Sequence, residues 1–324
     1  MPQVTYREAV KQALREELRN DERVFLVGED IGTFGGTNKV TLGLIDEFGE
    51  RRVRGTPISE GAIAGLAVGA AAAGLVPIAE IMYNDFVTLA MDQLVNQAAK
   101  MRYMFGAKLS LPLTVRIPMG GRRSAAGQHS QCLEAWFVHV PGLKVVVPSN
   151  PYDAKGLLKS AVRDPNPVLV FENKMLYNTN GEVPAEPYFV PLGRANVVRK
   201  GTDVTVVAIS DMVAFALQAA EALAVEGISV EVIDPRTLAP LDADTIARSV
   251  AKTGRLVVAH EANVTGGAGA EIAARVGYMA FDYLKAPIER VGAKDSPIPF
   301  SPVLERHILP DDGDVIEAVR RTLR

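Results

Sequence analysis

The sequence predicts an α/β fold with two domains. Short β-rich runs, such as residues 23–27 and 204–209, alternate with segments whose apolar residues recur at helical spacing. This alternation predicts mostly parallel sheets with helices on both faces. A length of 324 residues is enough for about two domains. We therefore expect two doubly wound α/β domains.

The first expected domain covers residues 1–185. Its expected helices are residues 6–20, 42–48, 60–74, 85–104 and 152–162. Its expected strands are residues 23–27, 76–82, 113–117, 143–147 and 168–172. Strand and helix therefore alternate from end to end of this domain.

The second expected domain covers residues 201–324, after a linker at residues 186–200. Periodicity fails from residue 173, and prolines accumulate at 184, 187 and 191. The expected strands that follow are residues 204–209, 229–233 and 255–259. The expected helices are residues 212–226, 243–251, 271–279 and 314–323.

Composition excludes several classes of function. The chain has 35 basic and 38 acidic residues and no basic stripe, so nucleic acid is not an expected partner. Its start lacks a signal or transit pattern, and its longest apolar stretch is interrupted by Pro77. We expect a cytoplasmic protein that does not bind membranes. The single cysteine, Cys132, excludes an intramolecular disulfide and a cysteine-rich zinc site.

Residues 56–74 form a polar turn followed by a helix of small residues. After Glu60 no side chain in this helix is charged or hydrogen-bonding, which predicts a helix buried all round. Small residues recur at four-residue spacing and would allow another backbone to approach, in the core or at a subunit interface: Gly61, Gly65, Gly69 and Ala73.

Glu60 is therefore expected at the rim of a dry region, in the first turn of this helix. Partial desolvation raises the pKa of a carboxyl and prepares it for proton chemistry. The alternative is that Glu60 only complements the positive end of the helix dipole.

The segment 119–131 combines glycines, two arginines and His129, which is typical of a loop that lines a cleft. His129 is the histidine that we expect to transfer protons near neutral pH. His139 and His260 are expected to be structural. The run 265–277, TGGAGAEIAARVG, lacks the third glycine of a dinucleotide fingerprint, so we expect a closely packed helix start there.

Several motifs together carry a resemblance that covers nearly the whole chain. They are FLVGED (25–30), TPISE (56–60), EIMYNDF (80–86), MDQLVNQAAKMRYMFG (91–106), GQHSQ (127–131) and PYDAKGLLKSAVRDPNPV (151–168). The chain resembles the β subunit of the decarboxylating component of 2-oxo acid dehydrogenase complexes, a thiamine-diphosphate family of the transketolase superfamily. The resemblance implies a transketolase-type pyrimidine-binding domain followed by a transketolase C-terminal domain.

The resemblance also implies residue roles. Glu60 would protonate a ring nitrogen of the aminopyrimidine and so promote ylid formation, while His129 would act at the reacting end of the cofactor. Further residues would contact the cofactor: Glu29, Ile58, Met82 and Phe86. The positions that match a potassium site in pyruvate-type relatives are Leu113, Ala161, Val162, Asp164 and Asn166.

A missing motif predicts a partner chain. This family binds the diphosphate through magnesium on a Gly-Asp-Gly motif, which this sequence lacks. The resemblance therefore implies an α-type chain that holds magnesium, in an α2β2 heterotetramer that acylates lipoamide on an acyltransferase core. The EIM and MRYMFG segments are similar to those of acetoin and pyruvate types. Two alternatives stay open: another ketol-transferring half chain of the transketolase type, or a non-catalytic scaffold subunit.

Overall fold

The computed structural model describes all 324 residues. The chain forms two compact units. The first contains Met1–Met119 and Trp136–Leu192, and the second contains Gly120–Ala135 and Gly193–Arg324. The segment Gly120–Ala135 lies inside the first domain expected from sequence, yet its contacts group it with the second unit.

The first unit is built on a parallel sheet with the strand order β6-β7-β5-β4-β2-β3. Its strands are β2 (Val24–Glu29), β3 (Val53–Thr56), β4 (Val76–Glu80), β5 (Thr114–Met119), β6 (Lys144–Val146) and β7 (Val168–Asn173). Strand β2 lies between β3 and β4, so the chain reverses its direction across the sheet here. Ligands of open α/β sheets bind beyond the carboxyl ends of the strands at such a switch point.

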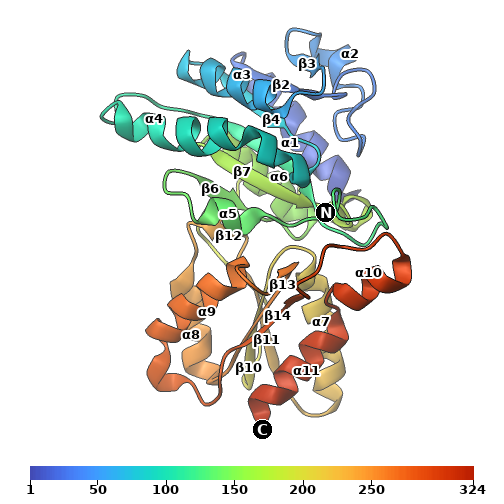
Figure 1. Cartoon of the computed structure of the whole chain (residues 1–324), viewed down its shortest axis with the longest axis vertical. Coiled ribbons are helices and arrows are strands. Elements are labelled where there is room, and N and C mark those ends of the chain that lie inside the picture. Colours follow the sequence, from blue (N-terminus) through green and yellow to red (C-terminus); the bar gives the residue numbers. More distant parts are fainter. The chain divides into compact units, whose positions relative to one another are not determined.

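Helices cover both faces of this sheet (Figure 1). Helices α1 (Tyr6–Asn20) and α6 (Pro151–Val162) pack together, and α3 (Glu60–Ala72) packs against β4. The N-caps of α1 and α6 are Thr5 and Asn150, whose side chains accept backbone N–H bonds. The smaller elements are β1 (Gln3–Thr5), α2 (Leu44–Phe48), α5 (Glu134–Val138), η3 (Leu176–Asn178) and β8 (Asn180–Glu182).

The expectation of one regular helix over residues 85–104 was wrong. The segment forms a 3₁₀ helix η1 (Asn84–Ala90), a π-helix η2 (Asp92–Ala98) and a short α-helix α4 (Ala99–Met104). Both η1 and η2 pack on α3, where a Cβ on Gly61 would lie 3.2 Å from the Leu89 carbonyl oxygen. Helical spacing of apolar residues predicts the face that packs, but it does not predict the tightness of each turn.

Helix α3 is buried on one side only within this chain, which corrects the expectation of burial all round. Its buried side consists of Glu60, Ile63, Ala64, Ala67, Val68 and Ala71. On the other side, Leu66 is 46% exposed, and a Cβ on Gly69 would touch no atom within 4 Å. The small-residue seam is therefore closed at Gly61 and open at Gly69.

The second unit has a sheet in the order β14-β13-β10-β11-β9, parallel except for β9. Its strands are β9 (Asn196–Arg199), β10 (Val204–Ala208), β11 (Val230–Asp234), β13 (Leu256–Asn263) and β14 (Glu289–Ala293), with a short β12 (Thr237–Ala239). Sequence reasoning missed β9 and β14, which lie at the two edges of the sheet.

Helices flank both faces of this second sheet as well (Figure 1). The helices are α7 (Met212–Val225), α8 (Ala243–Thr253), α9 (Ala268–Met279), η4 (Phe281–Tyr283), α10 (Pro302–Ile308) and α11 (Asp312–Leu323). Helices α7 and α11 pack together, as do α8 and α9. No helix in the structure combines the length and the apolar character that crossing a membrane requires.

The glycines of the run 265–277 make room for a buried histidine. A Cβ on Gly267 or Gly269 would lie 2.6 or 2.5 Å from ring atoms of His260. Nδ1 of His260 lies 3.0 Å from the Ala262 carbonyl oxygen, and burial lowers the pKa of this histidine to about 4. The expected closely packed helix start and the structural role of His260 are confirmed.

Candidate functional site

The carboxyl ends of β2, β3 and β4 bring acidic and polar residues together at the switch point. In the strand register Glu29 pairs with Thr56, and Gly28 pairs with Glu80. A hydrophobic sheet interior thus ends in a polar edge, and this edge lies where α/β sheets bind ligands.

The connection from β3 to α3 places Glu60 at this edge of the sheet. Strand β3 ends at Thr56, three residues turn the chain, and Glu60 is the first residue of α3. The N-cap Ser59 makes no side-chain capping bond, and Glu60 is only 5% exposed. A glutamate that merely complemented the helix dipole could remain in solvent, so its burial favours a chemical role over that alternative.

Glu29 is close enough to Glu60 to respond to its charge. Burial raises the pKa of Glu29, and the negative charges of Asp30 and Glu60 raise it further. Neighbouring carboxyl groups whose charges repel favour a state in which one of them holds a proton. Glu29 therefore holds a proton more readily than a carboxyl in solvent does.

Three of the expected cofactor contacts differ widely in exposure. Met82 is buried, Phe86 is half-buried, and Ile58, two residues before the buried Glu60, is 75% exposed. Two polar atoms in this region, Thr56 Oγ1 and Gln93 Oε1, are buried without a hydrogen-bond partner. Exposed apolar surface beside unpaired buried polar atoms suits a ligand with a flat ring and hydrogen-bonding edges.

A buried network of charged side chains joins strands β4, β5 and β7. Sequence analysis did not predict it. Arg116 contacts Glu80 at 2.5 Å and Glu172 at 2.8 Å, and the Tyr177 hydroxyl donates to Glu172 at 2.6 Å. Burial raises the pKa of Glu80, while the charge of Arg116 opposes that shift. The one available signal was a single arginine in the mostly apolar segment LTVRIPM (113–119).

His129 belongs to the second unit and is half-buried on an irregular loop. A cavity of about 280 Å³ lies beside this loop, lined by Gly127, Ser130, Gln131, Cys132, Glu261 and Asn263 among others. Near it, burial raises the pKa of Glu134 to about 7, with a further contribution from the charge of Glu261.

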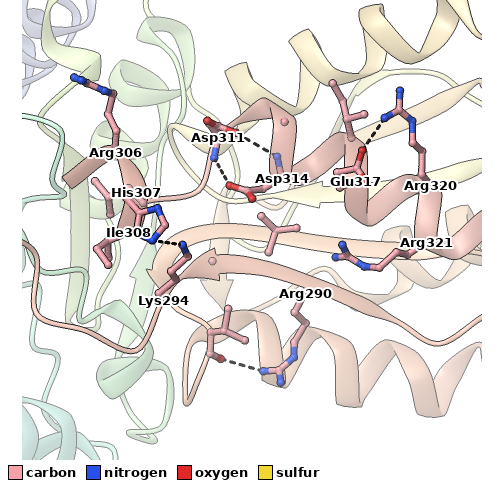
Figure 2. Close-up of a pocket in the computed structure, with 16 residues that line it drawn as sticks. Arg290, Lys294, Arg306, His307, Ile308, Asp311, Asp314, Glu317, Arg320 and Arg321 are labelled. Carbon is pink, nitrogen blue, oxygen red and sulfur yellow. Dashed lines mark hydrogen bonds and ion pairs between the residues drawn. The ribbon is translucent and has the colours of Figure 1, made fainter. Parts of the chain in front are cut away.

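A second cavity of the same unit, of about 690 Å³, contains none of the predicted site residues (Figure 2). Its charged groups largely pair with one another: Lys294 Nζ lies 3.0 Å from His307 Nε2, and Arg320 contacts Glu317 at 2.7 Å. Asp311 and Asp314 form the capping box of α11. These groups are accounted for by local structure.

The five residues expected to bind potassium gather at the opposite edge of the first sheet, where β5 and β7 begin. The Leu113 carbonyl accepts the Val168 N–H at 2.8 Å, and the Ala161 carbonyl accepts the Asp164 N–H at 3.1 Å. The Asp164 carboxylate accepts bonds from Asn166 and pairs with Lys144. No group of three or more His, Cys, Asp or Glu side chains is arranged to hold a metal.

The sequence matches models of two domains. Residues 2–180 match the transketolase pyrimidine-binding domain, and residues 193–315 match the transketolase C-terminal domain. A solved split-gene transketolase, described as an inactive β4 tetramer, superimposes with a TM-score of 0.79 at 25% identity and covers 99% of this chain and 98% of that one. The fold and the polar sheet edge thus define a transketolase-type protein.

Similar curated proteins show to which family within the transketolase-type class this chain belongs. The Bacillus subtilis (strain 168) acetoin:2,6-dichlorophenolindophenol oxidoreductase subunit beta is 47% identical, over 99% of this chain and 97% of that protein. The Rickettsia felis pyruvate dehydrogenase E1 subunit beta is 49% identical over 98% of both chains, and the Bos taurus mitochondrial protein is 47% identical over 99% and 91%. The chain belongs to this family of pyruvate and acetoin dehydrogenase E1 β subunits.

Proposed function

We propose that this chain is the β subunit of a thiamine-diphosphate-dependent 2-oxo acid or acetoin dehydrogenase. The enzyme decarboxylates or cleaves its substrate and transfers the acyl group to lipoamide. The observation that carries the proposal is the buried carboxyl of Glu60 beside Glu29, at the switch point of the first sheet.

Glu60 holds or donates a proton at a ring nitrogen of the bound aminopyrimidine. The buried carboxyl of Glu60 suits a hydrogen bond to a nitrogen partner, and Glu29 beside it has a pKa raised by burial and by nearby negative charges. Thiamine diphosphate, when bound, supplies the carbon nucleophile that attacks the substrate carbonyl. Met82, Phe86 and Ile58 would line the pyrimidine ring and shield it from water when the cofactor is bound.

The diphosphate end of the cofactor requires a second chain. A diphosphate is bound through a divalent cation with oxygen ligands, and this sequence has no Gly-Asp-Gly motif to provide them. An α-type chain supplies the magnesium ligands in an α2β2 heterotetramer. The open side of α3, where a Cβ on Gly69 would meet no atom within 4 Å, is a suitable surface for close backbone contact with a partner subunit.

The remaining groups have secondary roles. His129 transfers a proton as the acyl group moves to lipoamide. Potassium is bound by carbonyl oxygens near Leu113, Ala161 and Val162 with Asp164 and Asn166. That region lies at the strand edge opposite Glu60, so the ion stabilises the unit and does not take part in chemistry.

The proposed activity is tested by co-expressing this chain with an α-type chain that carries the Gly-Asp-Gly motif. Reduction of 2,6-dichlorophenolindophenol is measured with pyruvate, acetoin and branched-chain 2-oxo acids, and acylation of lipoamide is measured in parallel. Turnover of pyruvate or acetoin that requires thiamine diphosphate is the expected result. Consumption of sugar phosphates without turnover of any of these substrates would instead support a ketol-transferring half chain.

A further inference from the structure

The loop that carries His129 has an unusual backbone. Three alternate non-glycine residues, Arg122, Ser124 and Ala126, have φ values of +64°, +51° and +62°. Residues with a Cβ adopt this left-handed conformation only where the surrounding structure holds them in it. Three such residues in one loop indicate that contacts from other elements hold its path.

The first external contact comes from strand β13. Gly121 N–H donates to Glu261 Oε1 at 2.5 Å, and the side chain of Glu261 is only 3% exposed. Gly121 has no room for a side chain, because a Cβ there would lie 2.8 Å from Leu309 Cδ1 and 3.4 Å from oxygens of Glu261 and Glu305. The loop backbone thus lies directly on two buried carboxylates.

The second contact comes from helix α10. Ser124 N–H donates to Glu305 Oε2 at 3.0 Å, and Glu305 is 3% exposed. The other oxygen, Glu305 Oε1, is buried without a hydrogen-bond partner. A buried carboxylate that binds a backbone amide and little else is costly to keep for stability alone.

The third contact is made by Arg122 itself. Its guanidinium lies 3.4 Å from Asp211 at the N-cap of α7 and 3.8 Å from Glu261, and it donates to the Pro310 carbonyl at 2.5 Å. It also stacks over the Phe215 ring at 4.5 Å. Burial and the charge of Glu261 raise the pKa of Asp211, which matches a proton shared between these two carboxyls.

We propose that Glu261, Glu305 and Asp211 form a carboxylate clamp that holds the loop 120–131 and thereby positions His129 for acyl transfer. The catalytic part of this proposal depends on the proposed function. His129 lies five residues after the clamped Ser124, and its backbone nitrogen donates to the carbonyl oxygen of the left-handed Ala126 at 3.4 Å. The clamp holds two backbone amides, those of Gly121 and Ser124, and the side chain of Arg122.

Opening of the clamp can be measured by proteolysis of the loop. Trypsin cleaves after arginine, and Arg122 and Arg123 follow each other between the clamped amides of Gly121 and Ser124. Cleavage of a folded protein follows the population of the locally opened state when reclosing is fast. The measurement needs neither cofactor nor substrate.

Glu305→Ala removes the acceptor for Ser124 N–H, whereas Glu305→Gln keeps an oxygen in its place. We expect cleavage after Arg122 or Arg123 to be about tenfold faster in the alanine variant and within about twofold of the wild type in the glutamine variant. Glu289→Ala is the matched control, because Glu289 is a carboxylate of the same unit that pairs with Arg321 at the surface. Equal cleavage rates in all four proteins would overturn the clamp.

The positioning role is tested in the assembled enzyme. Glu305→Ala should lower the kcat for lipoamide acylation about tenfold more than the kcat for dichlorophenolindophenol reduction, and Glu305→Gln should restore the ratio. An equal loss in both assays would refute positioning of His129 and leave a structural role. A wild-type enzyme that turns over no 2-oxo acid or acetoin would refute the proposed function, whereas the cleavage contrast would still decide on the clamp.

Discussion

Glu60 and His129, the two residues expected to move protons, are held in different ways. Glu60 is the first residue of a regular helix, and three residues separate it from a strand of a parallel sheet. His129 lies on an irregular loop that contacts carboxylates from β13, α10 and the N-cap of α7. Local sequence therefore fixes the first residue, whereas tertiary contacts fix the second.

The difference predicts how each residue responds to substitution. Glu60 is positioned by the regular elements β3 and α3, so a change of its side chain should affect chemistry alone. Around His129, the support is itself ionisable, so substitutions and pH should alter both the loop and the chemistry.

The largest expected effect is that of Glu60→Gln in the assembled enzyme. An amide cannot transfer the proton, so kcat should fall about 10²- to 10⁴-fold with unchanged assembly. Dichlorophenolindophenol reduction and size-exclusion chromatography measure these two quantities. Glu22→Gln, which changes an exposed carboxylate, is the control. Activity of Glu60→Gln near that of the control would exclude the proposed role.

His129→Ala should act selectively. We expect the kcat for lipoamide acylation to fall about 10²-fold, with a smaller loss in dichlorophenolindophenol reduction, because the proton is needed as the acyl group leaves. His307→Ala, in the same unit but bonded to Lys294 outside the loop, should change neither. A uniform loss in both assays for His129→Ala would argue for a role in the shared first step.

Stability should depend on pH through Glu134. Its pKa is raised from 4.5 to about 7 by burial, so the folded state retains a proton that the unfolded state has already lost. Stability therefore falls as pH rises from about 4.5 to about 7, by at most about 3 kcal/mol. Urea unfolding at pH 5 and pH 8 should show this loss in the wild type and a smaller one in Glu134→Gln. A variant with the wild-type pH dependence would show that Glu134 is not the group responsible.

Much of the first region could be predicted from the sequence. The helix at Tyr6–Asn20, the strand at Val76–Glu80 and the start of α3 at Glu60 follow from local periodicity and turn residues. The clamp could not be predicted, because its partners lie 89, 140 and 181 residues from the loop in sequence. The open side of α3 was not predicted for another reason. An apolar sequence indicates that a helix is buried, but it does not indicate whether the same chain or a partner subunit covers it.

The smallest effects are expected from substitutions of Gly69 on the open side of α3. Gly69→Ala should be neutral or stabilising by up to about 1 kcal/mol in the isolated chain, because its Cβ meets no atom and alanine favours a helix. Gly69→Leu should leave the melting temperature of the isolated chain nearly unchanged and weaken assembly with the α-type chain, about tenfold. Thermal melts and sedimentation of the mixture measure the two effects. Normal assembly of Gly69→Leu would place the partner elsewhere.

The most direct test of the central claim is a calorimetric titration of thiamine diphosphate and magnesium. The ligands are added to this chain alone and to the chain assembled with an α-type subunit. The account predicts magnesium-dependent binding to the assembly only, because this chain provides Glu60 and the pyrimidine contacts but no diphosphate ligands. Tight magnesium-dependent binding to the isolated chain would contradict a site shared between two subunits.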